Sequence, residues 1–269
     1  MEQHRFITYK DKKIHYRDEG RDKDQVLVLL HGFLQNLDVW SSYTLSYMRY
    51  MRVINIDLPG HGYSDLLGDV QPMEEMADSV NAILDELNID KCVMVGHSLG
   101  GYVALAFAEK YPYKLKGLGL MHSHALGDTR QSQVYRNRVC ENVQLNRASY
   151  IVDFVSSLFA PENRLTLAQD IKDLQDECLE TTTESIMATQ RGMAMRPSRI
   201  KVLETLKVPI LFVFGKQDSR LKLEVGISEA MIPYHSEIVI LEGVGHMSHI
   251  EARDTIKVRL FNFLNACYN

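Results

Sequence analysis

The sequence predicts an α/β fold in which helices flank a mostly parallel sheet of eight strands and a helical segment is inserted late in the chain. Short aliphatic runs, typical of strands that are buried on both faces, recur along the sequence. Segments with helical periodicity separate most of these runs, as in a doubly wound sheet. Between about residues 123 and 206 the strand pattern disappears, and a polar-rich helical pattern takes its place.

Eight segments are expected to form the strands. Residues 6–18 alternate around Lys12 and Lys13, which predicts an opening pair of strands. Residues 26–30 form a continuous aliphatic run and are expected to begin the parallel part of the sheet. Further strands are expected at residues 53–56, 92–95, 118–121, 210–214 and 237–241.

Helices are predicted where apolar residues recur at spacings of three and four, which occurs at residues 73–87, 99–110 and 248–264. The second of these helices should end at Tyr111 because Pro112 cannot continue a helix. The strand-free stretch predicts a helical cap at residues 123–206, inserted after the sixth strand into a core formed by residues 1–122 and 207–269.

The composition and charge exclude several classes of partner. A formal net charge of −5 and the absence of basic runs argue against nucleic-acid binding. The first five residues lead into an alternating stretch, and no apolar run is long enough to span a bilayer, so we expect a cytoplasmic protein without a membrane partner. We expect a monomer or homodimer without a cofactor. The four cysteines are far apart and form no C-x-x-C pair, which favours buried free thiols in a reducing compartment: Cys92, Cys140, Cys178 and Cys267.

The strongest chemical motif places Ser98 between a strand and a helix. An aliphatic strand runs into Gly96-His97-Ser98-Leu99-Gly100, and a helical pattern begins at Leu99. In this arrangement a serine lies at a strained turn that requires glycine on either side, and its hydroxyl is held at the carboxyl edge of the sheet. Ser98 is therefore the predicted nucleophile.

A second motif follows the first buried strand, where His31-Gly32-Phe33 forms a turn at the expected edge of the sheet. The glycine allows the backbone to bend so that the N–H of Phe33 points into the site. Together with the N–H of Leu99, it is predicted to form an oxyanion hole. His31 and Gly32 are expected to contact the substrate.

A serine hydroxyl is a poor nucleophile until a neighbouring base takes its proton. Asp218 ends the turn after one late strand, and His246 ends a glycine-rich loop after the next. These two residues are the predicted acid and base, with Asp218 orienting the imidazole of His246 without itself taking the proton. Asp57 is expected to be solvated or structural.

The remaining histidines offer alternatives. His249 lies one helical turn beyond His246 but lacks the preceding glycine loop, so it is the weaker candidate for the base. His122 and His124 follow the strand at residues 118–121 and should reach the same sheet edge as Ser98. A metal pair there lacks a third ligand at suitable spacing, so we predict no metal and expect both residues to line the substrate pocket or to serve as a hinge. Three further histidines are expected at the surface: His4, His15 and His235.

Five motifs in this order resemble the α/β-hydrolase superfamily, in particular its small esterase-like members with a helical cap. They read HGF at residues 31–33, DLPGHGYS at 57–64, GHSLGG at 96–101, GKQD at 215–218 and GVGH at 243–246. The resemblance covers nearly the whole chain and implies the α/β-hydrolase fold. A serine at position 98 argues against the dehalogenase and epoxide-hydrolase branches, whose nucleophile is a carboxylate.

The motifs predict a carboxylesterase that cleaves a small ester or thioester through an acyl-enzyme on Ser98. One alternative is a carbon–carbon bond hydrolase or a menaquinone-pathway lyase that uses the same triad, with a cap arginine binding a substrate carboxylate. Another is a receptor-like protein that binds a ligand with little turnover. An apolar acyl pocket is expected in the cap, lined by Met187, Met193, Met195, Phe154 or Phe159.

Overall fold

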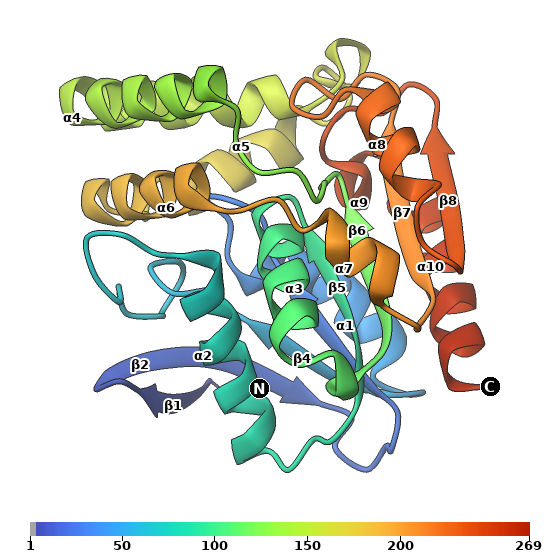
Figure 1. The fold of residues 1–269 in the computed structure, drawn as a ribbon. Helices are drawn as coiled ribbons and strands as arrows, with labels where there is room; N and C mark the ends of the chain where they lie inside the picture. Colours follow the sequence, from blue (N-terminus) through green and yellow to red (C-terminus); the bar gives the residue numbers. More distant parts are fainter. Residues whose placement is uncertain (1–3) are drawn as a thin grey trace.

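The computed structural model describes residues 4–269, and its sheet has eight strands in the order β1-β2-β4-β3-β5-β6-β7-β8 (Figure 1). The first pairing and the pairing of β2 with β4 are antiparallel, and all others are parallel. The predicted α/β fold with a mostly parallel sheet of eight strands is therefore confirmed. The strands are β1 Arg5–Tyr9, β2 Lys12–Glu19, β3 Val26–Leu30, β4 Arg52–Ile56, β5 Cys92–His97, β6 Leu115–Met121, β7 Ile210–Gly215 and β8 Ser236–Leu241. Residues 1–3, on which the localisation prediction partly rests, lie outside the described residues.

The order of the strands reverses at β3, because the chain continues from β3 to β4 on one side and later to β5 on the other. Ligands of open α/β sheets bind where such a reversal occurs, at the carboxyl ends of the strands. The register pairs Leu30 with Gly96, so β3 and β5 end side by side. This arrangement brings the loop at Phe33 next to the turn at Ser98.

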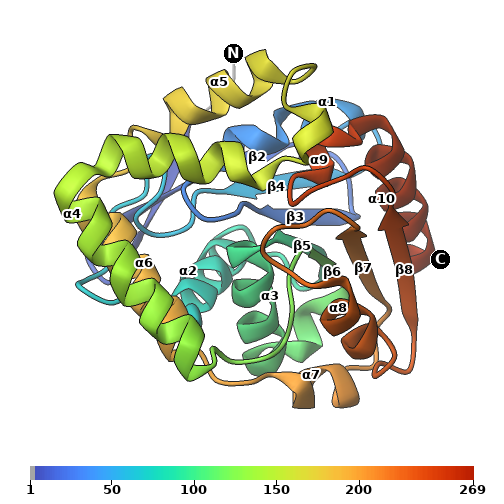
Figure 2. The same cartoon turned by 90° about the horizontal axis from the view of Figure 1, so that it is seen from above.

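Helices cover both faces of the sheet, which explains the continuous aliphatic runs in its strands. Along β3, Val26, Val28 and Leu30 face one apolar cluster, and Leu27 and Leu29 face the other. Helices α2 Met73–Glu86, α3 Leu99–Lys110, α7 Ile200–Thr205 and α8 Leu223–Ala230 lie on the first face, and the short α1 Ser41–Tyr47 and α10 Arg253–Tyr268 lie on the second (Figure 2). Three single turns of 3₁₀-helix complete the core and cap: Leu37–Trp40, Pro112–Lys114 and Pro161–Asn163.

The prediction of a single helix over residues 248–264 was wrong, because the structure has two helices in this segment. The chain instead forms α9, Ser248–Glu251, and then α10, separated by Ala252 with φ −133° and ψ 41°. The carboxylate of Glu251 turns back and accepts hydrogen bonds from the N–H groups of Gly245 and Met247. Glu251 therefore belongs to the loop that carries His246, a long-range role that local periodicity does not encode.

Three further helices lie in the cap above the carboxyl ends of the strands (Figures 1 and 2). Helix α4, Arg130–Leu158, bends into two arms at Asn146, where φ is −154° and ψ is 84°. The side chain of Asn146 accepts from the N–H of Ser149 and so caps the second arm. The other two helices are α5, Ala168–Cys178, and α6, Thr183–Met195, which packs along the first arm of α4.

The turn at residues 57–64 is tied to the opening hairpin through a buried histidine. His15 was predicted at the surface, but it is buried, and its Nδ1 lies 2.6 Å from Oδ2 of Asp57. Asp57 also accepts from the N–H of Leu37 at 2.7 Å and from that of Tyr63 at 2.9 Å. The prediction failed because alternation on an edge hairpin does not indicate that another loop covers it. Asp57 has a structural role.

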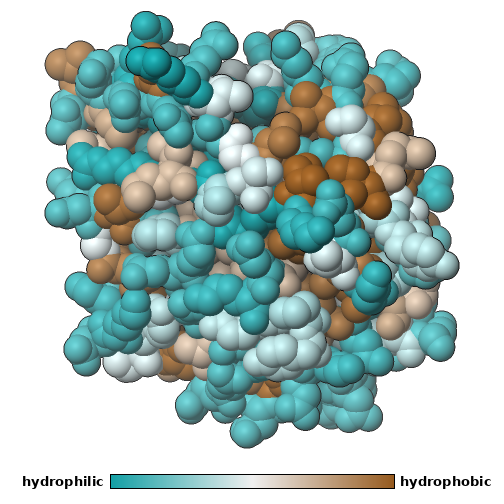
Figure 3. Space-filling view, in the orientation of Figure 1, coloured by the Kyte–Doolittle hydropathy of each residue, from teal (hydrophilic) through white to brown (hydrophobic). Residues whose placement is uncertain are grey.

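The surface in the view of Figure 3 is mostly hydrophilic, with smaller groups of hydrophobic residues between the polar areas. Within residues 4–269, no helix has the length and apolar character needed to cross a membrane. All four cysteines are free thiols; three are buried, and Cys267 is half-buried.

Candidate active site

Ser98 occupies a strained turn between β5 and α3. Its backbone has φ 50° and ψ −110°, in a region that residues other than glycine rarely adopt. A Cβ atom at Gly96 would lie 2.2 Å from the carbonyl oxygen of Gly100, and one at Gly100 would lie 2.5 Å from that of Leu30. The turn can therefore close only with glycine at both positions. It is held by Ser98 N–H donating to the carbonyl of Met121 at 2.8 Å.

Asp218 and His246 form a buried hydrogen-bonded pair at the same edge of the sheet. Nδ1 of His246 lies 2.8 Å from both carboxylate oxygens of Asp218. The backbone N–H groups of Arg220 and Leu221 donate to Oδ1 of Asp218 at 2.7 and 3.0 Å. Burial alone would raise the pKa of Asp218, but the neighbouring His246 and the hydrogen bonds from His122 and His246 hold that pKa well below its usual range. Asp218 therefore remains ionised and fixes the orientation of the His246 ring.

His97 connects this pair to the strand that ends at Ser98. Its Nε2–H donates to the backbone carbonyl of His246 at 2.9 Å, and the two rings are 5.1 Å apart. Within the described chain, neither the hydroxyl of Ser98 nor Nε2 of His246 makes a hydrogen bond. Both groups are therefore available to a substrate, and contacts between a nucleophile and its base commonly tighten when a substrate binds.

The loop at residues 31–33 presents a free backbone donor. Neither the N–H of Phe33 nor that of Leu99 is bonded to another residue in the part of the chain that the structure describes, as an oxyanion hole requires. The side chain of Gln35 accepts from the N–H of Gly32 at 2.8 Å. A Cβ atom at Gly32 would lie 2.5 Å from Nδ1 of His97, so a larger residue at position 32 would displace the His97 ring.

His31 is buried and stabilises the loop through hydrogen bonds. Its ring is fully buried, its Nδ1–H donates to the carbonyl of Gly32 at 2.8 Å, and its Nε2 accepts from the N–H of Leu58 at 2.9 Å. Burial lowers the pKa of His31, so the ring is neutral with this arrangement of donor and acceptor. The predicted substrate contacts of His31 and Gly32 have no exposed surface in this structure to support them, because both residues are used to shape the loop.

His122 is the contact that sequence reasoning missed. It was expected to line the pocket or to serve as a hinge, yet its side chain is fully buried and its Nδ1–H donates to Oδ2 of Asp218 at 2.8 Å. Burial lowers the pKa of His122 although Asp218 opposes this effect, so the ring is a neutral donor. The pairing of Met121 with Val213 in adjacent strands could have indicated that residues following β6 and β7 lie close together.

The two histidines and the carboxylate could in principle hold a metal ion, since one ligand atom from each lies within 4.8 Å of the others. However, each Nδ1 is 2.8 Å from a carboxylate oxygen. Ligand atoms on a tetrahedral zinc ion would be about 3.3 Å apart, given bonds of about 2.0 Å. The trio has the spacing of direct hydrogen bonds and does not fit an ion without rearrangement.

His124 and His249 lie apart from Asp218. The ring of His124 packs edge-on against Tyr102 of α3, and its Nε2 lies 3.4 Å from the guanidinium of Arg196 at the end of α6. His249 is buried between Trp40 and His97, with ring centroids 5.0 and 4.4 Å away. Neither ring nitrogen of His249 has a partner among the described residues, which makes it part of the packing beneath the site.

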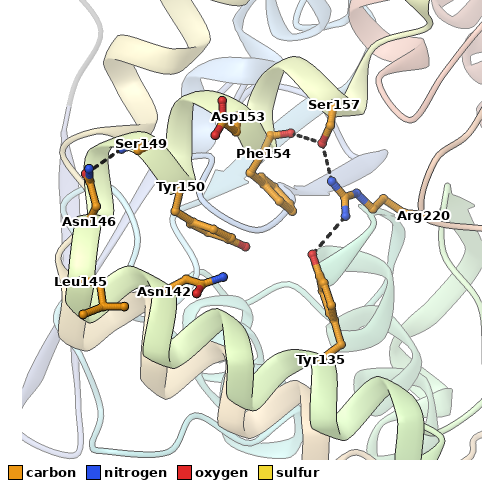
Figure 4. Close-up of a pocket in the computed structure, with 10 residues that line it drawn as sticks. All are labelled: Tyr135, Asn142, Leu145, Asn146, Ser149, Tyr150, Asp153, Phe154, Ser157 and Arg220. Carbon is orange, nitrogen blue, oxygen red and sulfur yellow. Dashed lines mark hydrogen bonds between the residues drawn. The ribbon is translucent and has the colours of Figure 1, made fainter.

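A cavity of about 530 Å³ opens between the arms of α4. Its wall includes Phe154, whose ring packs edge-on against that of Phe33 at 5.6 Å, so the cavity adjoins the loop that carries the free N–H. Ten residues line it: Tyr135, Asn142, Leu145, Asn146, Ser149, Tyr150, Asp153, Phe154, Ser157 and Arg220 (Figure 4). Of the five residues expected to form an apolar pocket, only Phe154 is among them, because polar side chains of α4 face this space.

The family model of the α/β-hydrolase fold matches residues 25–253 of this chain. The chain belongs to the α/β-hydrolase family. This finding confirms the resemblance seen in the five motifs, and the match extends across the β3–β8 part of the sheet and the cap.

The proteins to which this chain is similar are named for several different activities. The chain is 31% identical to the dihydrolipoyllysine-residue acetyltransferase component of an acetoin cleaving system from Pseudomonas putida, over 91% of this chain and 65% of that protein. It thus spans less than two thirds of that relative. It is 26% identical to a 2-hydroxy-6-oxononadienedioate/2-hydroxy-6-oxononatrienedioate hydrolase from Paraburkholderia phymatum, over 94% of this chain and 91% of that protein. A thermophilic esterase from Thermogutta terrifontis, solved with malate bound, superposes with a TM-score of 0.92 at 28% identity, covering 99% of this chain and 100% of the esterase.

Because several histidines are buried, we expect the free energy of unfolding to decrease as the pH is lowered. Burial lowers the pKa of His249, so its unfolded form binds a proton more readily than its folded form as the pH falls below about 6.5. Each such group lowers the free energy of unfolding by up to about 1.4 kcal/mol per pH unit in that range. The substitution His249→Phe keeps an aromatic ring against Trp40 and removes two unpartnered nitrogens. Urea unfolding from pH 7 to pH 5 should therefore give a shallower loss of stability for this variant.

The exposed His235→Gln variant serves as the control and should follow the wild-type curve. Parallel curves for His249→Phe and the wild type would show that burial of His249 makes no contribution to the acid sensitivity.

Proposed function

We propose that this protein is a serine hydrolase that cleaves a small carboxylic ester or thioester through an acyl-enzyme on Ser98. The observation that carries the proposal is the strained serine turn at the sheet edge that also holds the buried Asp218–His246 pair. The serine hydroxyl, the imidazole of His246 and the ionised carboxylate of Asp218 have the roles of nucleophile, base and orienting acid.

In the proposed reaction, the hydroxyl of Ser98 attacks the ester carbonyl carbon while Nε2 of His246 takes its proton. Asp218 stabilises the resulting imidazolium through Nδ1 and stays ionised. The N–H groups of Phe33 and Leu99 bind the oxyanion, and loss of one such donor typically costs about 3–4 kcal/mol of transition-state stabilisation. His246 then protonates the departing alcohol or thiol, and water repeats the sequence to release the acid and restore Ser98.

The similarity to the Thermogutta terrifontis esterase supports ester hydrolysis. Cleavage of a carbon–carbon bond is the second candidate, and the relatives named as 2-hydroxy-6-oxononadienedioate hydrolases favour it. That reaction was expected to use a cap arginine to bind the substrate carboxylate, and two of the cap arginines are not free to do so. Arg136 and Arg196 are already paired with the buried carboxylate of Asp128, and releasing either would leave part of that charge unpaired.

A fluorophosphonate probe tests the proposed nucleophile. Wild-type protein should bind one equivalent, because the probe phosphonylates an activated serine, and Ser98→Ala should bind none. His246→Ala should label at least about a hundredfold more slowly, since the hydroxyl then lacks its base. Intact-mass measurement gives the stoichiometry, and peptide mapping gives the position. Labelling that persists in Ser98→Ala would overturn the assignment, and a folded wild type that does not label would favour a binding protein.

The two candidate reactions differ in their products. A panel of short p-nitrophenyl esters should be hydrolysed by the wild type and left intact by Ser98→Ala. If the panel shows no turnover that depends on Ser98, while a carboxylated dienol ketone is cleaved, the carbon–carbon hydrolase is correct and the esterase is not.

The contact between His122 and Asp218 predicts a measurable effect on the pH profile. In His122→Ala the carboxylate loses one donor and becomes more basic, so it holds the protonated His246 more strongly. The acid limb of kcat/KM for an ester should move to higher pH, with a loss of about three- to tenfold near neutrality. In His122→Asn an amide N–H is retained, and asparagine tolerates the left-handed backbone of this position, where φ is 51°.

His122→Asn should therefore stay close to the wild-type profile, and thermal unfolding of both variants separates misfolding from the effect on the site. If the alanine and asparagine variants have the same profile as the wild type, His122 does not position the acid.

A further inference from the structure

Arg220 is a cation at the cavity between the arms of α4 that has no acidic partner among the described residues. Its guanidinium donates to the hydroxyls of Tyr135, at 3.3 Å, and Ser157, and stacks 4.7 Å from the centroid of the Phe154 ring (Figure 4). All of these partners are uncharged. The buried cap arginines differ, since they pair with carboxylates such as Asp128. A guanidinium has five N–H donors, so Arg220 retains donors for a further ligand.

Two more donors face the same cavity. The hydroxyl of Tyr150 is buried without a hydrogen-bond partner and points into the space between the arms (Figure 4). Burial raises the pKa of Tyr150, so this hydroxyl keeps its proton and can donate. Asn142 directs its amide into the same space from the first arm of α4. A buried hydroxyl without a partner is costly, which is the state that a bound acceptor would relieve.

Two contacts connect the cavity to the proposed catalytic groups, none of which lines it. The backbone N–H of Arg220 donates to Oδ1 of Asp218 at 2.7 Å, so the guanidinium projects from the loop that holds the acid. Phe154, against which Arg220 stacks, also packs on Phe33 of the proposed oxyanion loop. Asp153 lines the cavity as well, but its carboxylate points away from Arg220 (Figure 4).

We propose that this cavity binds a carboxylate carried by the substrate, with Arg220 as the cation and Tyr150 and Asn142 as additional donors. The inference rests on the proposed ester hydrolysis and narrows its substrate class to esters with a free acidic group. A guanidinium binds a carboxylate through paired N–H donors, and the apolar ring of Phe154 strengthens the interaction by excluding water from one side. The volume of about 530 Å³ is within the range of small-molecule sites.

Matched esters test the proposal because they differ only by exchange of a methyl group for a carboxylate. One pair places the difference on the acyl side: p-nitrophenyl hexanoate and the mono-p-nitrophenyl ester of adipic acid. The other pair places it on the alcohol side: 4-methylphenyl acetate and 4-acetoxybenzoate. For at least one pair, Arg220→Gln should lower kcat/KM of the carboxylated ester about tenfold or more, chiefly through KM, and change that of the neutral ester less than about threefold.

Two further variants define the interaction. Arg220→Lys keeps the charge but loses the planar pair of donors, so its loss on the carboxylated ester should be smaller than that of Arg220→Gln. Tyr150→Phe removes only the hydroxyl and should lower kcat/KM of the carboxylated ester about threefold or more without affecting its neutral partner. These substitutions leave the backbone donors to Asp218 in place, and thermal unfolding checks that the cap remains folded.

Equal losses on both members of each pair in Arg220→Gln would overturn the proposal and leave Arg220 as a link between the cap and the acid loop. If no ester is turned over in a Ser98-dependent manner, the proposed function fails instead. Calorimetric titration with adipate then still tests the cavity. Binding to the wild type that is lost in Arg220→Gln supports the anion site, and identical behaviour of the two proteins contradicts it.

Discussion

The buried carboxylate of Asp218 is the interaction on which the geometry of the site depends. An ionised group at this depth is tolerated only when hydrogen bonds and opposite charge replace its lost hydration. Within residues 4–269, Asp218 has four donors: the rings of His122 and His246 and the backbone N–H groups of Arg220 and Leu221. These donors come from the loops that follow β6, β7 and β8. The carboxylate of Asp218 therefore fixes the positions of the three loops relative to one another. The parallel strands bring the loops to one edge, and the carboxylate fixes their side chains.

A second layer of contacts extends this order to the serine and the oxyanion loop. His97 precedes Ser98 and binds the carbonyl of His246, while Gln35 and the ring of His31 hold the loop around Gly32. Most of these groups are buried and neutral. They preorganise the backbone without adding charge near the position where an oxyanion would form. We propose that the substrate is selected at the cavity that the bend at Asn146 opens, where Arg220 from the loop after β7 supplies the cation.

The fold and the glycine-flanked turn at Ser98 could be predicted because their causes are local. Glycines at 96 and 100 are required by the backbone of the turn itself, and aliphatic runs such as residues 26–30 reflect burial on both faces. The rest depends on contacts between distant segments. Burial of His15 requires the turn at residues 57–64 to cover it, and the bond from His122 to Asp218 joins residues 96 positions apart. The break at Ala252 and the polar lining of the cap cavity likewise follow from tertiary packing, which periodicity within one segment does not report.

The central claim is that a hydroxyl, an imidazole and two backbone donors converge on a single reacting atom. A crystal structure of the protein after reaction with a small alkyl phosphonate measures this directly. The account predicts phosphorus bonded to Oγ of Ser98, with Nε2 of His246 within about 3.2 Å of an oxygen on phosphorus. The phosphoryl oxygen should lie about 2.7–3.1 Å from the nitrogens of Phe33 and Leu99. A phosphonyl group on another residue, or an adduct on Ser98 with His246 out of reach and neither N–H pointing at the oxygen, would contradict it.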